Sequence, residues 1–116
     1  MKQENYPAYT TFTNSAISNA LALQYMLEAY IDDRDRDVLG SALFIAREQV
    51  ALIDSAQSQD LLDTLELKAR SISVYLMLSG LSDMASCGEQ TESLPEAILT
   101  MIKSCIIVIE TMRCNV

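Results

Sequence analysis

At 116 residues the chain is long enough to bury one hydrophobic core without disulfides or metal ions, and we expect a single domain over residues 1–116. Half of the residues are hydrophobic but only 6% are aromatic, with three Gly and two Pro, a composition that favours helices over strands. The net charge of −8 and the lack of a basic segment argue against direct binding of nucleic acid or of an anionic membrane surface.

The cysteines and the apolar runs predict where the protein resides. Three cysteines, none of them in a close C-x-x-C pair, indicate reduced intracellular thiols rather than a disulfide framework. Residues 1–15 are polar and lack the apolar middle of a signal peptide. The longest wholly apolar run near the C-terminus, at 105–109, is far shorter than the roughly 20 residues that span a bilayer. We therefore expect a cytoplasmic protein that does not enter membranes.

The first helix is predicted from about residue 13 to about residue 31. Its apolar residues recur at alternating steps of four and three, which places them on one helical face. Thr13 or Asn14 is expected to cap its N-terminus. Residues 1–12, which contain Pro7, are expected to form a flexible lead. The predicted buried residues are Ala16, Ala20, Leu23, Leu27 and Tyr30.

A second helix is expected after the acidic segment that ends at Asp37. Its apolar stripe is wide, which is typical of a helix packed in a globular bundle rather than in a two-stranded coiled coil. We expect it to end before a turn near Gln57, because continuation would give a helix of about 50 residues, long for a compact domain. The predicted stripe consists of Val38, Leu39, Ala42, Ile45, Ala46, Gln49, Leu52 and Ile53.

The third predicted helix carries two apolar lines on different faces. Such a helix is expected to be buried on more than one side. We assign the first line to the core of the bundle and the second to an interface with a partner. The first line is Leu62, Leu65, Ala69, Ile72, Leu76 and Ser79. The second line is Leu67, Val74, Leu78, Leu81 and Ala85.

The fourth helix has the best-marked start. The sequence SLPE, from Ser93 to Glu96, fits a capping box in which each side chain accepts the other residue's backbone N–H, and Pro95 sits where a missing donor is tolerated. Four amphipathic helices with short connections predict an all-α fold, an antiparallel up-down four-helix bundle. The predicted buried face of the fourth helix is Leu94, Ile98, Met101, Cys105, Val108 and Met112.

The segment DDRDRD, which ends at Asp37, admits three interpretations. A calcium loop would need Gly at its sixth position and Glu at its twelfth, where this chain has Val38 and Phe44. A magnesium motif of the D-D-x-x-D type would need an acid in place of Arg36, and paired E-x-x-E motifs are absent. The interpretation that we favour is a turn in which Asp35 or Asp37 caps the second helix.

The residue types that most often carry out catalysis are scarce. The chain has no histidine, which removes the commonest general base and the commonest metal ligand. Its three glycines are isolated and form no phosphate-binding loop. Cysteine spacings of 18 and 9 residues do not match the close pairs of structural zinc sites. We therefore expect a protein that is not an enzyme and that has no cofactor, metal site or catalytic residue.

The remaining candidate for a functional site is the surface of the protein. Phe44 and Ile107 fall on otherwise polar helix faces, and together with the second line of the third helix they suggest more apolar surface than one monomer hides. We expect this surface to bind another protein or a second copy of the chain. The expected interaction residues are Phe44, Leu67, Val74, Leu78, Leu81 and Ile107.

Three functions remain open on these grounds. The leading hypothesis is a small acidic helical protein that acts by protein–protein interaction, as an adaptor, a chaperone-like factor or a regulator, and forms a homodimer. The first alternative is an acidic inhibitor of a nucleic-acid-processing or host-defence protein, of the kind that phages encode. The second alternative is a metal-dependent hydrolase that uses carboxylates alone.

Overall fold

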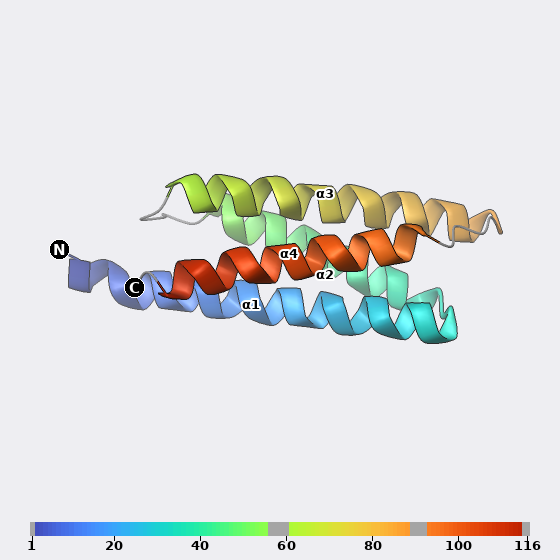
Figure 1. Cartoon of the computed structure of the whole chain (residues 1–116), viewed down its shortest axis with the longest axis horizontal. Helices are drawn as coiled ribbons and strands as arrows, with labels where there is room; N and C mark the ends of the chain where they lie inside the picture. The colour runs from blue at the N-terminus through green and yellow to red at the C-terminus, as the bar shows by residue number, and fades with distance from the viewer. Residues whose placement is uncertain (1, 56–60, 89–92, 115–116) are drawn as a thin grey trace.

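Four α-helices make up the part of the chain that the structure, a computed structural model, describes: residues 2–55, 61–88 and 93–114. They are shown in Figure 1 and confirm the predicted all-α class. The bounds are α1 Lys2–Asp33, α2 Asp37–Ser55, α3 Leu61–Ser86 and α4 Leu94–Cys114.

The helices lie lengthwise beside one another and pack as a ring (Figure 1). α1 packs against α2 and α4, and α3 packs against the same two helices, while the described backbones of the diagonal pairs are not neighbours. The molecule measures 54 × 20 × 20 Å, so its cross-section is about two helix diameters in each direction. These contacts are those of a helical bundle with one central core.

α1 begins at Lys2 rather than near Thr13, so residues 2–12 belong to the helix. The helix continues through Pro7, which has no N–H to donate to the carbonyl of Gln3. The Thr13 hydroxyl donates to the Thr10 carbonyl at 3.1 Å within the helix, so Thr13 is not the N-cap. Among the side chains described, from Thr10 onward, the buried face includes Phe12 and all five predicted residues.

α2 has the wide stripe that was predicted, with its centre shifted by one residue. The residues that it buries fully are Leu39, Ala42, Ala46, Gln49 and Ile53. Val38, Ile45 and Leu52 lie at the edges and are half-buried. α2 and α3 are separate helices that pack on each other, and the turn predicted near Gln57 lies outside the described residues.

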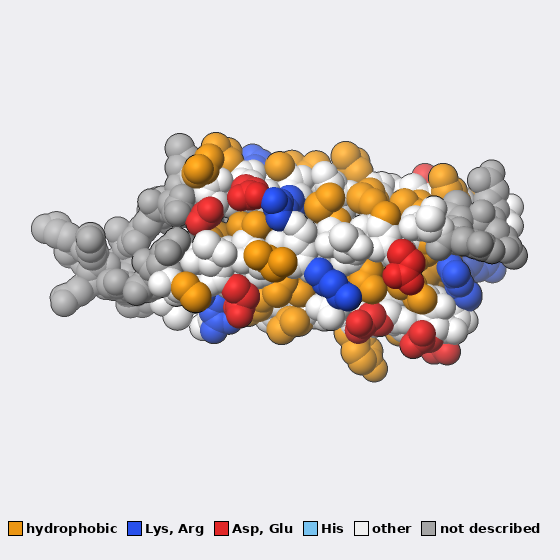
Figure 2. All heavy atoms as spheres, in the orientation of Figure 1, with side chains coloured by type: hydrophobic (Ala, Val, Ile, Leu, Met, Phe, Trp, Pro, Cys, Tyr) orange, Lys and Arg blue, Asp and Glu red, His pale blue; other side chains and the backbone are white. Residues whose placement is uncertain are grey.

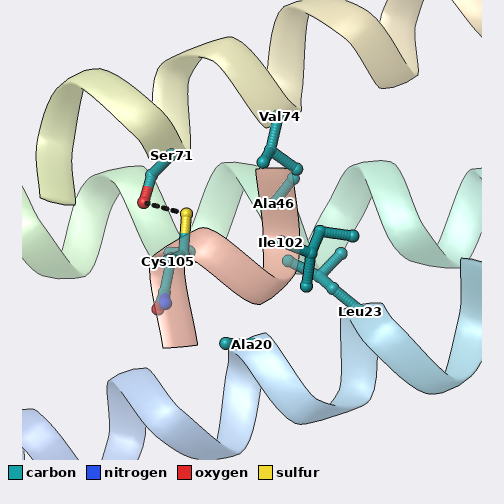
Figure 3. Close-up of a pocket in the computed structure, with 8 residues that line it drawn as sticks. Ala20, Leu23, Ala46, Ser71, Val74, Ile102 and Cys105 are labelled. Carbon is teal, nitrogen blue, oxygen red and sulfur yellow. Dashed lines mark hydrogen bonds between the residues drawn. The ribbon is translucent and has the colours of Figure 1, made fainter. Parts of the chain in front are cut away.

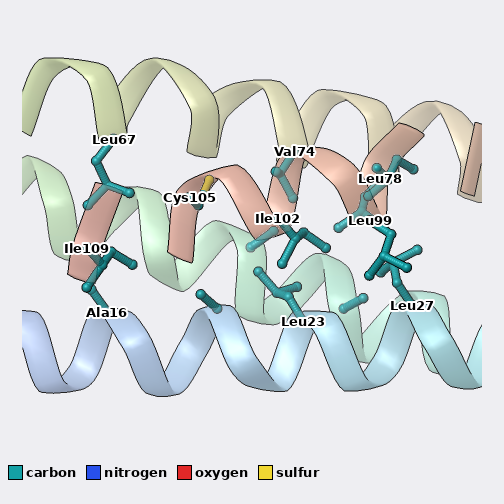
Figure 4. Close-up of a cluster of buried hydrophobic side chains, with 14 of the residues drawn as sticks. Ala16, Leu23, Leu27, Leu67, Val74, Leu78, Leu99, Ile102, Cys105 and Ile109 are labelled. Atoms are coloured by element: carbon teal, nitrogen blue, oxygen red, sulfur yellow. The ribbon is translucent and has the colours of Figure 1, made fainter. Parts of the chain in front are cut away.

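The predicted orientation of α3 is wrong. The second apolar line, expected at the surface, fills the core, and we call it the inner line. The first apolar line, expected in the core, faces outward. Leu78 is 0% exposed and Leu76 is 60% exposed, although both are leucines two residues apart. Figure 4 shows Leu67, Val74 and Leu78 pointing from α3 into the interior, toward Ala16, Leu23 and Leu27 of α1. Placing Leu67, Val74, Leu78 and Leu81 on an interaction surface is therefore wrong, because their side chains fill the core of the monomer.

α4 starts where the sequence predicts. The N–H of Ala97 donates to the Ser93 carbonyl at 3.0 Å, which puts Ser93 at the N-cap position, and Pro95 is buried in the first turn. Its buried face includes Ile98, Leu99, Ile102, Cys105, Val108, Ile109 and Met112. None of the four helices, over the residues described, combines the length and apolar character needed to cross a bilayer.

Candidate interaction surface

The aspartate-rich segment forms the turn between α1 and α2. The Asp35 carboxylate accepts the backbone N–H of Asp37 at 3.0 Å, which is the hydrogen bond of an N-cap. Arg34 has a φ of 56°, in the left-handed region, and its N–H donates to the Tyr30 carbonyl at 2.7 Å, which ends α1. The favoured interpretation, a capped turn, therefore agrees with the hydrogen bonds.

The arginines of this turn also have structural partners. The Arg36 guanidinium donates at 3.0 Å to the Ala85 carbonyl, which also accepts the Gly88 N–H at 3.1 Å, and this contact ties the turn to the end of α3. The Arg34 guanidinium lies 5.4 Å from the centre of the Tyr30 ring, a cation–π contact. Within the described ranges, no three Asp, Glu or Cys side chains are close enough together to hold a metal ion.

Substitution of Asp35 distinguishes a cap from a cation site. Asn caps a helix about as well as Asp, whereas Ala cannot accept the Asp37 N–H. We expect Asp35→Asn to leave the free energy of unfolding nearly unchanged and Asp35→Ala to lower it by about 1 kcal/mol. Urea unfolding followed by circular dichroism measures both. A saturable rise in melting temperature with millimolar Ca²⁺ or Mg²⁺ that Asp35→Asn abolishes would contradict the assignment.

The core contains one polar layer. Gln49, 2% exposed, donates through Nε2 to the Ala16 carbonyl at 2.9 Å and accepts the Asn19 amide through Oε1 at 3.0 Å. On the other side of the layer, Ser71 Oγ and Cys105 Sγ lie 4.0 Å apart, as Figure 3 shows. The layer encloses a cavity of about 10 Å³, which is no larger than one water molecule requires. This cavity is too small to be a substrate site.

The three cysteines differ in burial, and burial lowers the reactivity of a thiol. Burial raises the pKa of the Cys105 thiol, and the Ser71 hydroxyl and the Arg70 charge offset only part of that rise. The Cys105 thiol is therefore protonated at neutral pH, which makes it a poor nucleophile. Cys87 and Cys114 are exposed and unbridged, at the ends of α3 and α4.

Phe44 and Ile107 are exposed as expected, 61% and 65% respectively. Phe44 lies on α2 and Ile107 on α4, two helices on opposite sides of the ring whose described backbones are not neighbours. These two residues therefore do not form one surface together, and the structure does not unite the predicted interaction residues.

Three exposed leucines, Leu62, Leu65 and Leu76, lie on one face of α3. We call the apolar line on this face the outer line, and it consists of Leu62, Leu65, Ala69, Ile72 and Leu76. Ile72 is half-buried and the other four are exposed. Figure 2 shows apolar side chains along the edge of the molecule that α3 forms. Alternating steps of three and four keep the line on one helix face.

A groove between α2 and α3 adjoins the outer line. It has a volume of about 270 Å³ and is lined by Val50 and Ala51 from α2 and by Ile72 and Tyr75 from α3. Arg47 and Asp54 complete its lining. Because Ile72 belongs to both the groove and the outer line, the two make one continuous surface, which we call the α2/α3 face.

Polar contacts on either side of the outer line hold α3 to its neighbours. Toward α2, Lys68 pairs with Asp54 at 2.7 Å, and Arg47 lies over the Tyr75 ring at 6.0 Å from its centre. Toward α4, Arg70 contacts Glu66 and the hydroxyl of Ser104. The long charged side chains that flank the outer line therefore point toward α2 and α4, and they leave the outer line itself apolar.

Sequence reasoning missed the outer line as a surface, although one signal identifies it. Continued by the same steps, the outer line reaches Ser79 and then Asp83, whereas the inner line continues through Leu81 to Ala85. A line that ends in an aspartate is a poor choice for the core, because a buried carboxylate without a partner is costly. The structure agrees, since Asp83 is exposed and Ala85 is buried. Leu21 and Tyr25, exposed on α1, were also not anticipated.

Comparison of the chain with models of protein families, with curated proteins and with solved structures finds no match in any of the three. The function must therefore be argued from the geometry described above.

Proposed function

We propose that the protein acts by binding another protein through the α2/α3 face, as an adaptor or regulator, without catalysing a reaction. The observation that carries the proposal is the outer line of α3: four exposed apolar residues at regular helical spacing, beside a groove with an apolar floor. An amphipathic helix laid along such a line removes apolar surface from water, which is the main favourable term in protein association. The missing histidine and the buried, protonated Cys105 support a role other than catalysis.

The bundle itself, we further propose, has the up-down antiparallel order and works in the cytoplasm. The short turn between α1 and α2, residues 34–36, supports antiparallel neighbours. The hydrogen bond from Arg36 to Ala85 supports the same order, because it places that turn beside the C-terminal end of α3. Three free cysteines without a disulfide are in keeping with a reducing compartment.

The test compares Leu76→Glu with Tyr25→Glu. Both residues are exposed, but Tyr25 lies on α1, which is diagonal to α3 in the described structure. Proteins captured from a lysate of the native host by the wild-type chain are identified, purified and titrated against all three proteins by calorimetry. We expect Leu76→Glu to weaken binding at least about tenfold, because a charge then enters the apolar contact, and Tyr25→Glu to bind as the wild type does. Equal affinity for the three proteins would refute the α2/α3 face as the binding surface.

A further inference from the structure

The outer line of α3 has the spacing of a two-helix seam. Leu62, Leu65, Ala69, Ile72, Leu76 and Ser79 follow steps of three, four, three, four and three, which is the a/d pattern of a heptad. The inner line of the same helix already fills the monomer core, so the outer heptad has no partner within the described chain. A second helix with the same pattern would cover it. Resting on the proposed function, in which the α2/α3 face binds another protein, we propose that the outer line also binds a second copy of this chain, with the two α3 helices packed antiparallel.

The side-chain sizes favour one register. With the twofold axis between Arg70 and Ser71, Leu65 packs against Leu76 of the second copy, and Ala69 packs against Ile72 of the second copy. Each small residue then faces a large one, which is how tightly packed layers interdigitate. A parallel pairing would instead stack Ala69 on Ala69 and leave a void. The antiparallel arrangement also ends at a dimer, because both copies use the same patch and a third copy finds none free.

The charges permit two copies to meet here. From Leu62 to Ser79 the charged residues are Asp63, Glu66, Lys68 and Arg70, a net charge of zero on a chain of net charge −8. In the antiparallel register Glu66 lies near Ser73 of the second copy, and Lys68 lies near Tyr75 of the second copy, so no like charges are opposed. Mutual repulsion between acidic copies is therefore small along this seam.

The length of the seam limits its strength. From Leu62 to Ser79 an α-helix rises about 26 Å, and with a helix width of about 10 Å the seam covers on the order of 300 Å² per copy. That is well below the roughly 800 Å² per partner of a standard interface, even though the α2/α3 groove widens one side. We therefore expect a weak, transient dimer that is populated only at high protein concentration.

Sedimentation equilibrium of the full chain from about 5 to 500 µM tests the assembly. We expect the wild type and Tyr25→Glu to rise from 12.9 kDa toward twice that mass. Leu76→Glu and Leu65→Lys should each stay monomeric, with helical circular dichroism retained because both positions are solvent-exposed in the monomer. A wild type that is monomeric at the highest concentration, or variants that dimerise as it does, would overturn the proposal.

A mixture of the two variants tests the register. In the antiparallel pair, Lys at position 65 faces Glu at position 76 of the second copy, so an equimolar mixture of Leu65→Lys and Leu76→Glu should regain the dimer. A parallel pair places position 65 beside position 65 and gives no such rescue, so a mixture that stays monomeric beside a dimeric wild type contradicts the antiparallel seam. A monomeric wild type whose captured partner still depends on Leu76 would defeat this inference alone and leave the proposed function standing.

Discussion

Leu78→Glu is expected to abolish the native fold, whereas Leu76→Glu is expected to leave it intact. Leu78 is fully buried among the side chains of the core, so a glutamate there would lose its water without gaining a partner. We expect a loss of at least about 4 kcal/mol, comparable with the whole stability of a small domain. Leu76 is exposed on the same helix, and a charge there stays hydrated.

Urea unfolding and near-ultraviolet circular dichroism of the two variants provide the measurement. Because both change Leu to Glu on α3, they share the effect on helix propensity, and the difference between them reports burial alone. A folded Leu78→Glu beside an unfolded Leu76→Glu would mean that the inner and outer lines of α3 exchange places.

The second large effect is expected at Gln49. Gln49→Glu replaces the Nε2 donor with a carboxylate oxygen that faces the Ala16 carbonyl oxygen, in a buried layer. At neutral pH the charge is either buried with the Asn19 amide as its remaining donor or must take up a proton. We expect a loss of about 3 to 5 kcal/mol at pH 7. Gln49→Leu, of similar size, should cost at most about 1.5 kcal/mol, since Asn19 is only half-buried and can turn to water.

The pH dependence of Gln49→Glu gives the physical reason for its loss. Burial raises the pKa of such a carboxyl in the folded state above its unfolded value of about 4. The folded state then binds the proton more tightly, so the deficit relative to the wild type is smallest below about pH 4 and grows as the pH rises through the unfolded pKa toward the folded one. When protonated, the carboxyl regains an O–H donor for the Ala16 carbonyl. A deficit that does not change with pH, measured against the wild type at each pH, would contradict the hydrogen bond.

The hydrophobic period predicts the helices and most of the core. In α1, all five residues assigned to the buried face are buried, because the apolar line that recurs at steps of four and three faces the core. In α4 the capping sequence predicts the start, and four of the six residues assigned to the buried face are buried, while Leu94 and Met101 are half-buried. The start of α1 is not predicted, because the apolar period begins only near Thr13 whereas the helix begins at Lys2.

The proposed binding surface was not predicted from the sequence, because α3 carries two lines of nearly equal apolar character. Which one turns inward depends on the helices on either side: Lys68 reaches Asp54 on α2 and Arg70 reaches Ser104 on α4. These contacts orient α3 about its axis, and they join residues far apart in the sequence. The hydrophobic period of one helix carries no information about such long-range contacts. Val74 and Leu78 were therefore predicted at the surface, and Leu65 and Leu76 in the core.

The central claim is that the outer line of α3 faces water in the monomer and is covered on binding. NMR of leucine methyl groups with a soluble paramagnetic agent tests it most directly, from micromolar to near-millimolar protein. The account predicts strong relaxation of the Leu65 and Leu76 methyls in dilute protein and protection as the protein is concentrated or the captured partner is added, with Leu78 protected throughout. Methyls of Leu65 and Leu76 that are protected even at high dilution, or that stay exposed in the bound state, would contradict it.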